Sequence, residues 1–326
     1  MSKLVTIYGG SGFVGRYIAR RMAKAGWRVR VAVRRPNEAM FVRPYGAVGQ
    51  VEPVLCNIRD DASVAAVMHG ADAVVNCVGI LSETKRNKFD SVQHEGAERI
   101  ARLAKEAGVA KLVHISAIGA DENAASDYSK SKALGEQGIL ENFPEAVILR
   151  PSVIFGNEDE FFNRFASMSR LGPILPIFGG NTRFQPVYVD DVAEAAENAI
   201  LGDATGIYEL GGPEALTLHA AIEKMLGVVH RKRLVMNLPF FAGRILAGIL
   251  DFVQFVSMGL IHNGVLTGDQ LKSLRVDNVV SDDAKTLNDL GVTPTTMDAI
   301  MPTYLWRFRP NGQFEELRDS AKNLKA

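Results

Sequence analysis

Three glycines and a tyrosine–lysine pair are the residues whose types and spacing could do chemistry. Gly9, Gly12 and Gly15 lie in the stretch GGSGFVG, and Tyr128 and Lys132 lie in YSKSK. Glycines at this spacing permit a tight turn, a close approach of the backbone to a pyrophosphate and close packing of the following helix. The tyrosine and the lysine are one helical turn apart and share a face. An ammonium beside a phenol lowers the phenol pKa, so the pair is a candidate acid–base group for hydride transfer.

The glycine turn has the flanking elements that a nucleotide-binding turn needs. LVTIY before it is a short apolar run typical of a buried strand, and RYIARRMAKAG after it has apolar residues at helical spacing. The helix N-terminus offers N–H groups and a positive dipole end to phosphates. A glycine-rich turn without a ligand is the alternative. The pattern favours dinucleotide binding through Gly9, Ser11, Gly12, Phe13, Val14 and Gly15.

The end of the second predicted strand, VAVRRP, separates the two nicotinamide dinucleotides. An NAD site usually carries an acidic residue here, which binds the ribose 2′-hydroxyl. No carboxylate occurs before Glu38, and Arg34 and Arg35 occupy the position. A guanidinium suits a 2′-phosphate, so the sequence predicts NADPH or NADP rather than NAD. The alternative is that both arginines are solvated surface residues.

Strand-like and helix-like segments alternate as far as Pro151, which indicates an α/β fold with a doubly wound parallel sheet, together with a smaller, mainly helical C-terminal lobe. We predict a dinucleotide-binding core over 1–155 and a C-terminal lobe over 156–326, interleaved with the core around 185–212. Glycines and prolines between Gly172 and Pro186 predict loops. PVYVDDVAEAAENAIL predicts a short strand that leads into a helix.

Composition narrows the class of protein. The 326 residues contain 37 Lys+Arg and 37 Asp+Glu, so the zero net charge makes no case for a nucleic-acid partner. Cys56 and Cys77 are the only cysteines and lie in no metal-binding motif, so we expect no metal site and a reducing compartment. The glycine motif begins at Gly9, which suggests that no leader peptide precedes the fold.

Together, the glycine turn, HIS at a strand end, YSKSK, LRPSVIFG and VYVDDVA resemble the extended and atypical short-chain dehydrogenase/reductase superfamily. The resemblance implies that Tyr128 and Lys132 face the nicotinamide and that residues from Pro151 to Ile154 touch its ring. It also implies cofactor contacts from a further set of residues: Asn57, Ile58, Val78, Gly79 and Ser116.

Three positions depart from the pattern of the active extended members. Ile118 stands where a Ser or Thr usually orients the substrate carbonyl. Gln93 stands where a helix Asn often supports the lysine through water, and Asn57 where an Asp often contacts adenine. The resemblance therefore implies a retained cofactor pocket with eroded catalytic chemistry. Tyr128 and Lys132 are catalytic candidates only.

A narrower resemblance spans nearly the whole chain. IFGNEDEFFNRFASM, LTGDQLKSLRVDNVVS and LNDLGVTPTTMDAIMPTYLWRF resemble the dehydrogenase-like accessory subunit of respiratory complex I, in its alphaproteobacterial branch. The resemblance implies a tightly held, structural NADPH and a place on the peripheral arm near its junction with the membrane arm. The implied partners are complex I subunits near the quinone-binding junction. The implied location is the cytoplasmic side of the bacterial inner membrane.

The segment 239–260 is unusually apolar. In FFAGRILAGILDFVQFVSM the interior polar side chains are Arg244, Asp251, Gln254 and Ser257, and Pro239 is placed to open a helix. Two charges in a barely sufficient run argue against a membrane span. The sequence alone favours a buried helix of the lobe, and the resemblance favours contact with a partner or a membrane surface.

Three functions stay open at this point. The first is a structural or regulatory complex I subunit with bound NADPH. The second is a free-standing NADP-dependent oxidoreductase or nucleotide-sugar epimerase or dehydratase that uses Tyr128 and Lys132. The third is a redox sensor that binds its partners only when NADPH is present.

Overall fold

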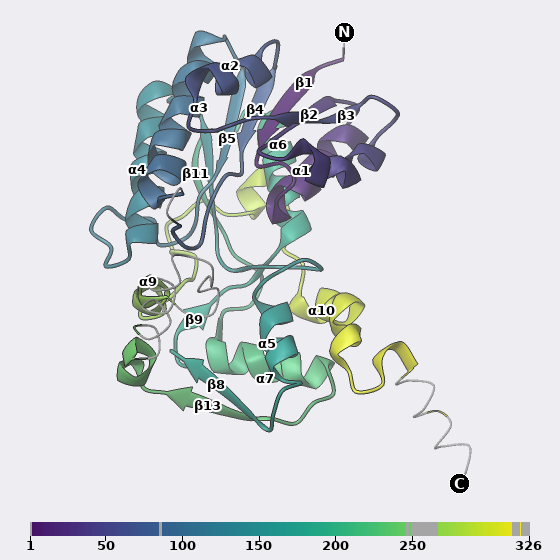
Figure 1. The fold of residues 1–326 in the computed structure, drawn as a ribbon, viewed down its shortest axis with the longest axis vertical. Helices are drawn as coiled ribbons and strands as arrows, with labels where there is room; N and C mark the ends of the chain where they lie inside the picture. The colour runs from purple at the N-terminus through teal and green to yellow at the C-terminus, as the bar shows by residue number, and fades with distance from the viewer. Residues whose placement is uncertain (1, 85–86, 246–247, 249–266, 315–319, 321–326) are drawn as a thin grey trace.

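The computed structural model describes residues 2–84, 87–245, 248, 267–314 and 320. Their centre is a seven-stranded sheet in the order β11-β6-β5-β4-β1-β2-β3, in which every neighbouring pair is parallel. Helices lie on both faces of the sheet, and a smaller lobe lies below it in Figure 1. The predicted doubly wound parallel sheet is confirmed. The strand order reverses between β1 and β4, and ligands of such sheets bind outside the carboxyl ends of the strands at this point.

The elements of the sheet follow the predicted alternation. The strands are β1 (Leu4–Tyr8), β2 (Arg28–Val33), β3 (Val51–Leu55), β4 (Ala73–Asn76), β5 (Lys111–Ile115), β6 (Val147–Pro151) and β11 (Gly206–Leu210). The helices are α1 (Phe13–Lys24), α2 (Asp61–Met68), α3 (Glu95–Glu106), α4 (Asp127–Asn142) and α6 (Val189–Leu201), with the short helices η1 (Pro36–Tyr45) and η2 (Asp90–His94). Because β11 follows α6 in the chain, the core sheet is completed from beyond residue 155. The boundary at that residue remains a prediction.

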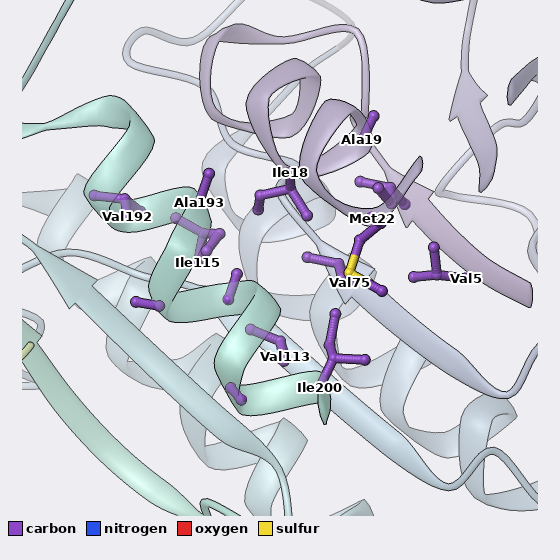
Figure 2. Packing of buried hydrophobic residues seen from close by; sticks show 14 of the residues in the cluster. Val5, Ile18, Ala19, Met22, Val75, Val113, Ile115, Val192, Ala193 and Ile200 are labelled. Atoms are coloured by element: carbon purple, nitrogen blue, oxygen red, sulfur yellow. The ribbon is translucent and has the colours of Figure 1, made fainter. Parts of the chain in front are cut away.

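Alternate residues of each strand face opposite sides of the sheet, which produces two apolar cores. Ile18 and Met22 of α1 pack with α6 against Val5 and Val75, as Figure 2 shows. On the other face, Tyr8, Val74 and Leu112 pack against α2, α3 and α4. Burying one large apolar side chain stabilises the fold by about 1.5–3 kcal/mol, so these two layers hold the strand ends in fixed positions.

The smaller lobe combines helices with short strand pairs. Its helices include α5 (Phe162–Met168), α7 (Leu218–Val228), α9 (Gly268–Ser273) and α10 (Met297–Leu305), followed by the short helices η4 (Trp306–Phe308) and η5 (Gly312–Phe314); η3 (Asn288–Leu290) lies beside α6. The strand pairs are β7 (Ile154–Phe155) with β10 (Val187–Tyr188), β9 (Arg183–Phe184) with β12 (Leu216–Thr217), and β8 (Ile174–Phe178) with β13 (Leu234–Leu238). A third apolar core, which includes Phe155, Phe162 and Met301, lies between these elements.

The prediction of loops between Gly172 and Pro186 was wrong for β8 and for the two-residue strand β9. Residues Ile174–Phe178 form a strand that pairs in parallel with β13, with Ile174 opposite Leu234. Taken alone, Pro176 argues against a strand here, because proline has no N–H to donate to the hydrogen bonds between strands. The partner strand is distant in sequence, so no local pattern predicts this pairing.

The apolar segment 239–260 lies mostly outside the described residues. A helix begins at Phe240, directly after Pro239 as predicted, and its first turns are described as far as Ile245. In this part Phe241 and Ile245 are 61% and 62% exposed, while the Gly243 backbone approaches Phe178 of β8. This part of the helix therefore presents apolar side chains to solvent. Among the described residues no helix is both long and apolar enough to cross a bilayer.

Candidate functional site

The glycine turn between β1 and α1 has the conformation that its residues predict. Gly9 has a φ of +73°, a left-handed value that glycine adopts without strain. A Cβ on Gly15 would lie 2.5 Å from the Gly9 carbonyl oxygen and 2.7 Å from the Gly10 Cα. The turn therefore folds back on the first turn of α1, and only a residue without a side chain fits at position 15.

The N-terminus of α1 is open to an anion. Its N-cap is Gly12, which offers no side-chain cap, and its first turn contains no acidic residue. The first intrahelical backbone bond is donated by the Arg16 N–H to the Gly12 carbonyl, so the preceding N–H groups of the helix have no intrahelical acceptor. Ser11, Phe13 and Val14 lie at this end. The residues present fit a pyrophosphate.

Arg16 is a residue of this site that the sequence analysis missed. Its guanidinium donates to the carbonyls of Ser11 and Gly12 at 3.1 and 3.2 Å, and it stacks on the Phe41 ring at 4.9 Å from the ring centroid. The Arg16 side chain therefore stabilises the conformation of the glycine turn. Its position directly after Gly15, the third glycine, is the feature of the sequence that could have indicated this role.

The two arginines after β2 differ in their side-chain contacts. Arg35 pairs with Glu38 at 3.0 Å, and both side chains are exposed. Arg34 is also exposed and makes no hydrogen bond or ion pair with the described part of the chain. Arg34 is thus the cation available to a phosphate here. Asn57 follows β3 and is exposed, and its Oδ1 accepts from the Arg59 N–H at 3.3 Å.

The other predicted contacts follow the ends of β3, β4 and β6. The Ile58 side chain lies in the core beside Gly96. The Gly9 turn lies against the backbone of Cys77 and Val78, and Gly79 follows in an exposed position. Pro151 is buried at the end of β6, and Ile154 is half-buried against the core under α1 and α6.

At the carboxyl end of β5, α4 brings Lys132 against the strand. The Lys132 Nζ donates to the Ile115 carbonyl at 3.0 Å. A Cβ on Gly79 would lie 3.5 Å from that Nζ and 3.6 Å from the Gln93 Oε1. Both polar atoms therefore lie close to the Gly79 backbone. The Gln93 Oε1 and the Ser116 Oγ are buried and have no hydrogen-bond partner in the described structure. Buried polar groups normally have partners, so these two atoms fit a polar ligand at this end of the sheet.

The expected lowering of the Tyr128 pKa was wrong. Burial raises the pKa of Tyr128 to about 12, and the Lys132 charge is not among the causes. The lysine ammonium is directed to the Ile115 carbonyl, and the tyrosine ring packs edge-on against Phe89 at 6.0 Å between centroids. Ile118, at the position where active relatives carry a hydroxyl, is 8% exposed. The pair shares one helix, but this arrangement does not activate the phenol.

Burial of the charged Lys132 side chain lowers the stability of the folded protein. Burial, opposed by Glu136, lowers the pKa of Lys132 to about 8 from 10.5. We expect Lys132→Met to raise the free energy of unfolding of the cofactor-free protein at pH 7 by about 1 kcal/mol or more, because the buried charge is removed. The same variant should bind NADPH more weakly. Chemical denaturation and dinucleotide titration measure the two effects.

The pH dependence of this prediction has a definite sign. Below pH 8 the lysine is charged in both states, so the folded state carries the full burial penalty. Between pH 8 and 10.5 the folded lysine is neutral while the unfolded lysine is still charged, so the penalty shrinks as pH rises. The stability difference between the variant and the wild type should narrow across this range. A constant difference would contradict a charge effect.

The sheet order, the glycine turn and the tyrosine–lysine helix define a nucleotide-binding α/β protein of the short-chain dehydrogenase type. Residues 5–211 match the model of the NAD dependent epimerase/dehydratase family. A dTDP-glucose 4,6-dehydratase from Streptomyces venezuelae, solved with NAD bound, has a TM-score of 0.69 at 19% identity, over 96% of this chain and 99% of that one. The fold of the chain is therefore that of the family.

Two relatives narrow the class. "NADH dehydrogenase [ubiquinone] 1 alpha subcomplex subunit 9, mitochondrial" from Arabidopsis thaliana is 34% identical over 95% of this chain and 79% of its own length. The protein of the same name from Mus musculus is 32% identical over 90% of this chain and 78% of its own length. The chain belongs to the NAD dependent epimerase/dehydratase family and, within it, to the complex I accessory subunits that these relatives represent.

Proposed function

We propose that the chain is a non-catalytic accessory subunit of respiratory complex I that retains NADPH as a structural ligand. It belongs to the alphaproteobacterial branch and lies on the cytoplasmic side of the inner membrane, where it stabilises the peripheral arm near the membrane junction. The observation that carries the proposal is a relationship to complex I subunits that covers 95% of the chain. A relationship of this extent includes the smaller lobe as well as the nucleotide-binding core.

The residues that would hold the dinucleotide come from the core. The N-terminus of α1 and the Gly9–Gly15 turn would hold the pyrophosphate, and Arg34 the 2′-phosphate. Lys132, Gln93 and Ser116 would bind the nicotinamide ribose and ring. The family name supports a nucleotide cofactor, and the reason to prefer NADPH to NADH is Arg34, which has no partner among the described residues.

The smaller lobe presents apolar side chains that fit a docking role. Ile174 and Leu234 are paired neighbours on β8 and β13 and are 47% and 61% exposed. Phe241 and Ile245 are exposed on the helix that packs on β8 through Gly243. Exposed apolar groups on adjoining elements are typical of surfaces that another molecule covers. We propose that these elements contact other complex I subunits or the lipid surface beside them.

The proposal is tested by native mass spectrometry of a gently solubilised membrane extract. The expected result is that the chain co-migrates with complex I and carries the mass of NADPH. A chain found only as a free species, with no complex I subunit attached, would refute the subunit role. A complex I subunit that carries NAD or no nucleotide would refute only the structural NADPH.

The alternative is a free-standing NADP-dependent oxidoreductase, or a nucleotide-sugar epimerase or dehydratase. Tyr128 and Lys132 on one face of α4, with the buried Ser116 hydroxyl nearby, favour it. The nicotinamide would donate the hydride in a reduction, and in an epimerase or dehydratase it would accept a hydride and return it. Tyr128 would transfer the proton, which its pKa of about 12 makes difficult near neutral pH.

Tyr128→Phe separates the two functions. For an accessory subunit we expect NADPH content, complex I yield and NADH:ubiquinone turnover to change by less than about twofold, because the phenol oxygen is lost and the packing on Phe89 is kept. Bound NADPH should stay reduced when carbonyl and nucleotide-sugar substrates are added. If a substrate oxidises NADPH in the wild type and Tyr128→Phe abolishes that reaction, the enzyme reading replaces ours.

A further inference from the structure

A carboxylate from the C-terminal part of the chain caps the helix that carries Tyr128 and Lys132. Asp269 of α9 accepts hydrogen bonds from the Asp127 N–H at 2.8 Å, the Tyr128 N–H at 3.0 Å and the Ser126 hydroxyl at 2.9 Å. The two N–H groups belong to the first turn of α4, where a helix has no acceptors of its own and its dipole favours a negative charge. The start of α4 is therefore positioned by a residue more than 130 positions away in the chain.

A second contact from the same segment ties together two strand ends. The Asn278 Oδ1 accepts from the Ser152 hydroxyl at 2.7 Å, and its Nδ2 donates to the Ile118 carbonyl at 3.1 Å. Ser152 follows β6, and Ile118 follows β5 and Ser116. Asn278 thus fixes the two loops beside the nicotinamide end of the site.

The segment 267–281, which we call the strap, is also anchored in the lobe and at the edge of the sheet. The Thr182 hydroxyl donates to the Leu274 carbonyl, and the Asp277 Oδ1 accepts from the Arg183 N–H at 2.8 Å. At its far end the Ser281 N–H donates to Glu209 of β11 at 2.8 Å. The strap therefore runs from the start of α4 across the carboxyl ends of the strands to β11, and it joins the lobe to the dinucleotide site.

We propose that Asp269 and Asn278 are positioning residues that couple the nicotinamide end of the dinucleotide site to the strap. This proposal rests on the proposed NADPH binding and deepens it. A dinucleotide that contacts Lys132 and Ser116 needs α4 and the β5 and β6 loops in the places that the strap fixes. By linkage, the bound dinucleotide must stabilise the strap by the same free energy that the strap contributes to binding. Binding of the dinucleotide therefore stabilises the strap, and the strap contacts Thr182 and Arg183 of the lobe.

The test compares two ligands in the full-length protein. NADPH reaches both ends of the site, whereas 2′,5′-ADP reaches only the glycine turn and Arg34. For Asp269→Asn we expect the Kd of NADPH to rise about tenfold and the Kd of 2′,5′-ADP to stay unchanged. In the wild type, NADPH should protect the amides of 267–281 from hydrogen exchange, and 2′,5′-ADP should not. The variant should lose this protection while the amides of the glycine turn keep theirs.

The matched control is Asp282→Asn, because Asp282 is exposed just beyond the strap and has no hydrogen bond or ion pair with the described residues. It should behave as the wild type. Ser152→Ala removes the hydroxyl that donates to Asn278 and accepts from the Gln185 N–H at 3.2 Å, and it should weaken NADPH in the same direction if Asp269→Asn does not fold. If Asp269→Asn weakens the binding of NADPH and of 2′,5′-ADP equally, Asp269 has a general structural role and the coupling is overturned. Unchanged NADPH binding in this variant would also overturn it. A wild type that binds neither ligand would overturn the proposed NADPH binding and this inference with it.

Discussion

Replacing Gly15 with alanine is expected to abolish NADPH retention and, as a result, assembly into complex I. The new Cβ would lie 2.5 Å from the Gly9 carbonyl oxygen and 2.7 Å from the Gly10 Cα. Both are backbone atoms and cannot rotate away, so the turn must open at a cost of about 1–3 kcal/mol. The opening moves the N–H groups that would hold the pyrophosphate. Nucleotide content by mass spectrometry and complex I yield from membranes measure the outcome.

The loss of ligand should also lower the melting temperature of the subunit. A ligand present at a thousand times its dissociation constant stabilises the folded state by about 4 kcal/mol, and the variant forgoes that contribution. The control is Gly227→Ala in α7, where an added Cβ meets no atom within 4 Å. This change should be neutral or slightly stabilising, because alanine favours a helix over glycine. A Gly15→Ala protein that retains NADPH and assembles normally would contradict the structural role of the dinucleotide.

Reversing the charge at Arg34 should reverse the preference for the cofactor. With Arg34→Glu we expect the Kd of NADPH to rise by about a hundredfold, since a charge-assisted bond to the 2′-phosphate is replaced by repulsion. NADH should bind as well as before or better, because a carboxylate at this place accepts a hydrogen bond from the ribose 2′-hydroxyl. Parallel titrations with the two dinucleotides give the ratio directly.

Arg35→Glu is the matched control for this experiment. Arg35 is also exposed and already pairs with Glu38, and exposed pairs contribute little, so we expect less than about a fivefold change for NADPH. If both reversals weaken NADPH equally, the arginines act only through their general field. If neither changes the ratio of NADPH to NADH affinity, the preference for the phosphorylated dinucleotide was wrongly assigned to Arg34.

The core of this molecule could be predicted because its signals are local. The strands before Pro151 are short segments rich in apolar residues and bounded by turn residues, and the glycine spacing specifies a turn whose geometry depends on few neighbours. The same reasoning placed Arg34 directly after β2 and Lys132 on α4, whereas their contacts with a cofactor remain a prediction. These predictions needed only the periodicity of strands and helices and the steric freedom of glycine.

What could not be predicted depends on contacts between distant parts of the chain. β8 forms because β13 pairs with it, against the local signal of Pro176. The direction of the Tyr128 pKa shift follows from burial and from the acceptor that Lys132 finds on β5. Nothing in the sequence distinguishes Asp269 from the other aspartates, and only the folded chain places it at the start of α4.

The passage of the strap over the strand ends has a consequence for biogenesis. The glycine turn and strands β1 to β6 are all complete by residue 151, whereas the strap ends at residue 281. At ordinary rates of translation, on the order of ten seconds separates the emergence of these two parts from the ribosome. Under the proposed coupling, a nascent chain would bind the nucleotide weakly at first and tightly only after Ser281 has been made. The order of synthesis would then set the order of maturation, because the exposed apolar side chains proposed for docking, the last of them Ile245, are made before the strap.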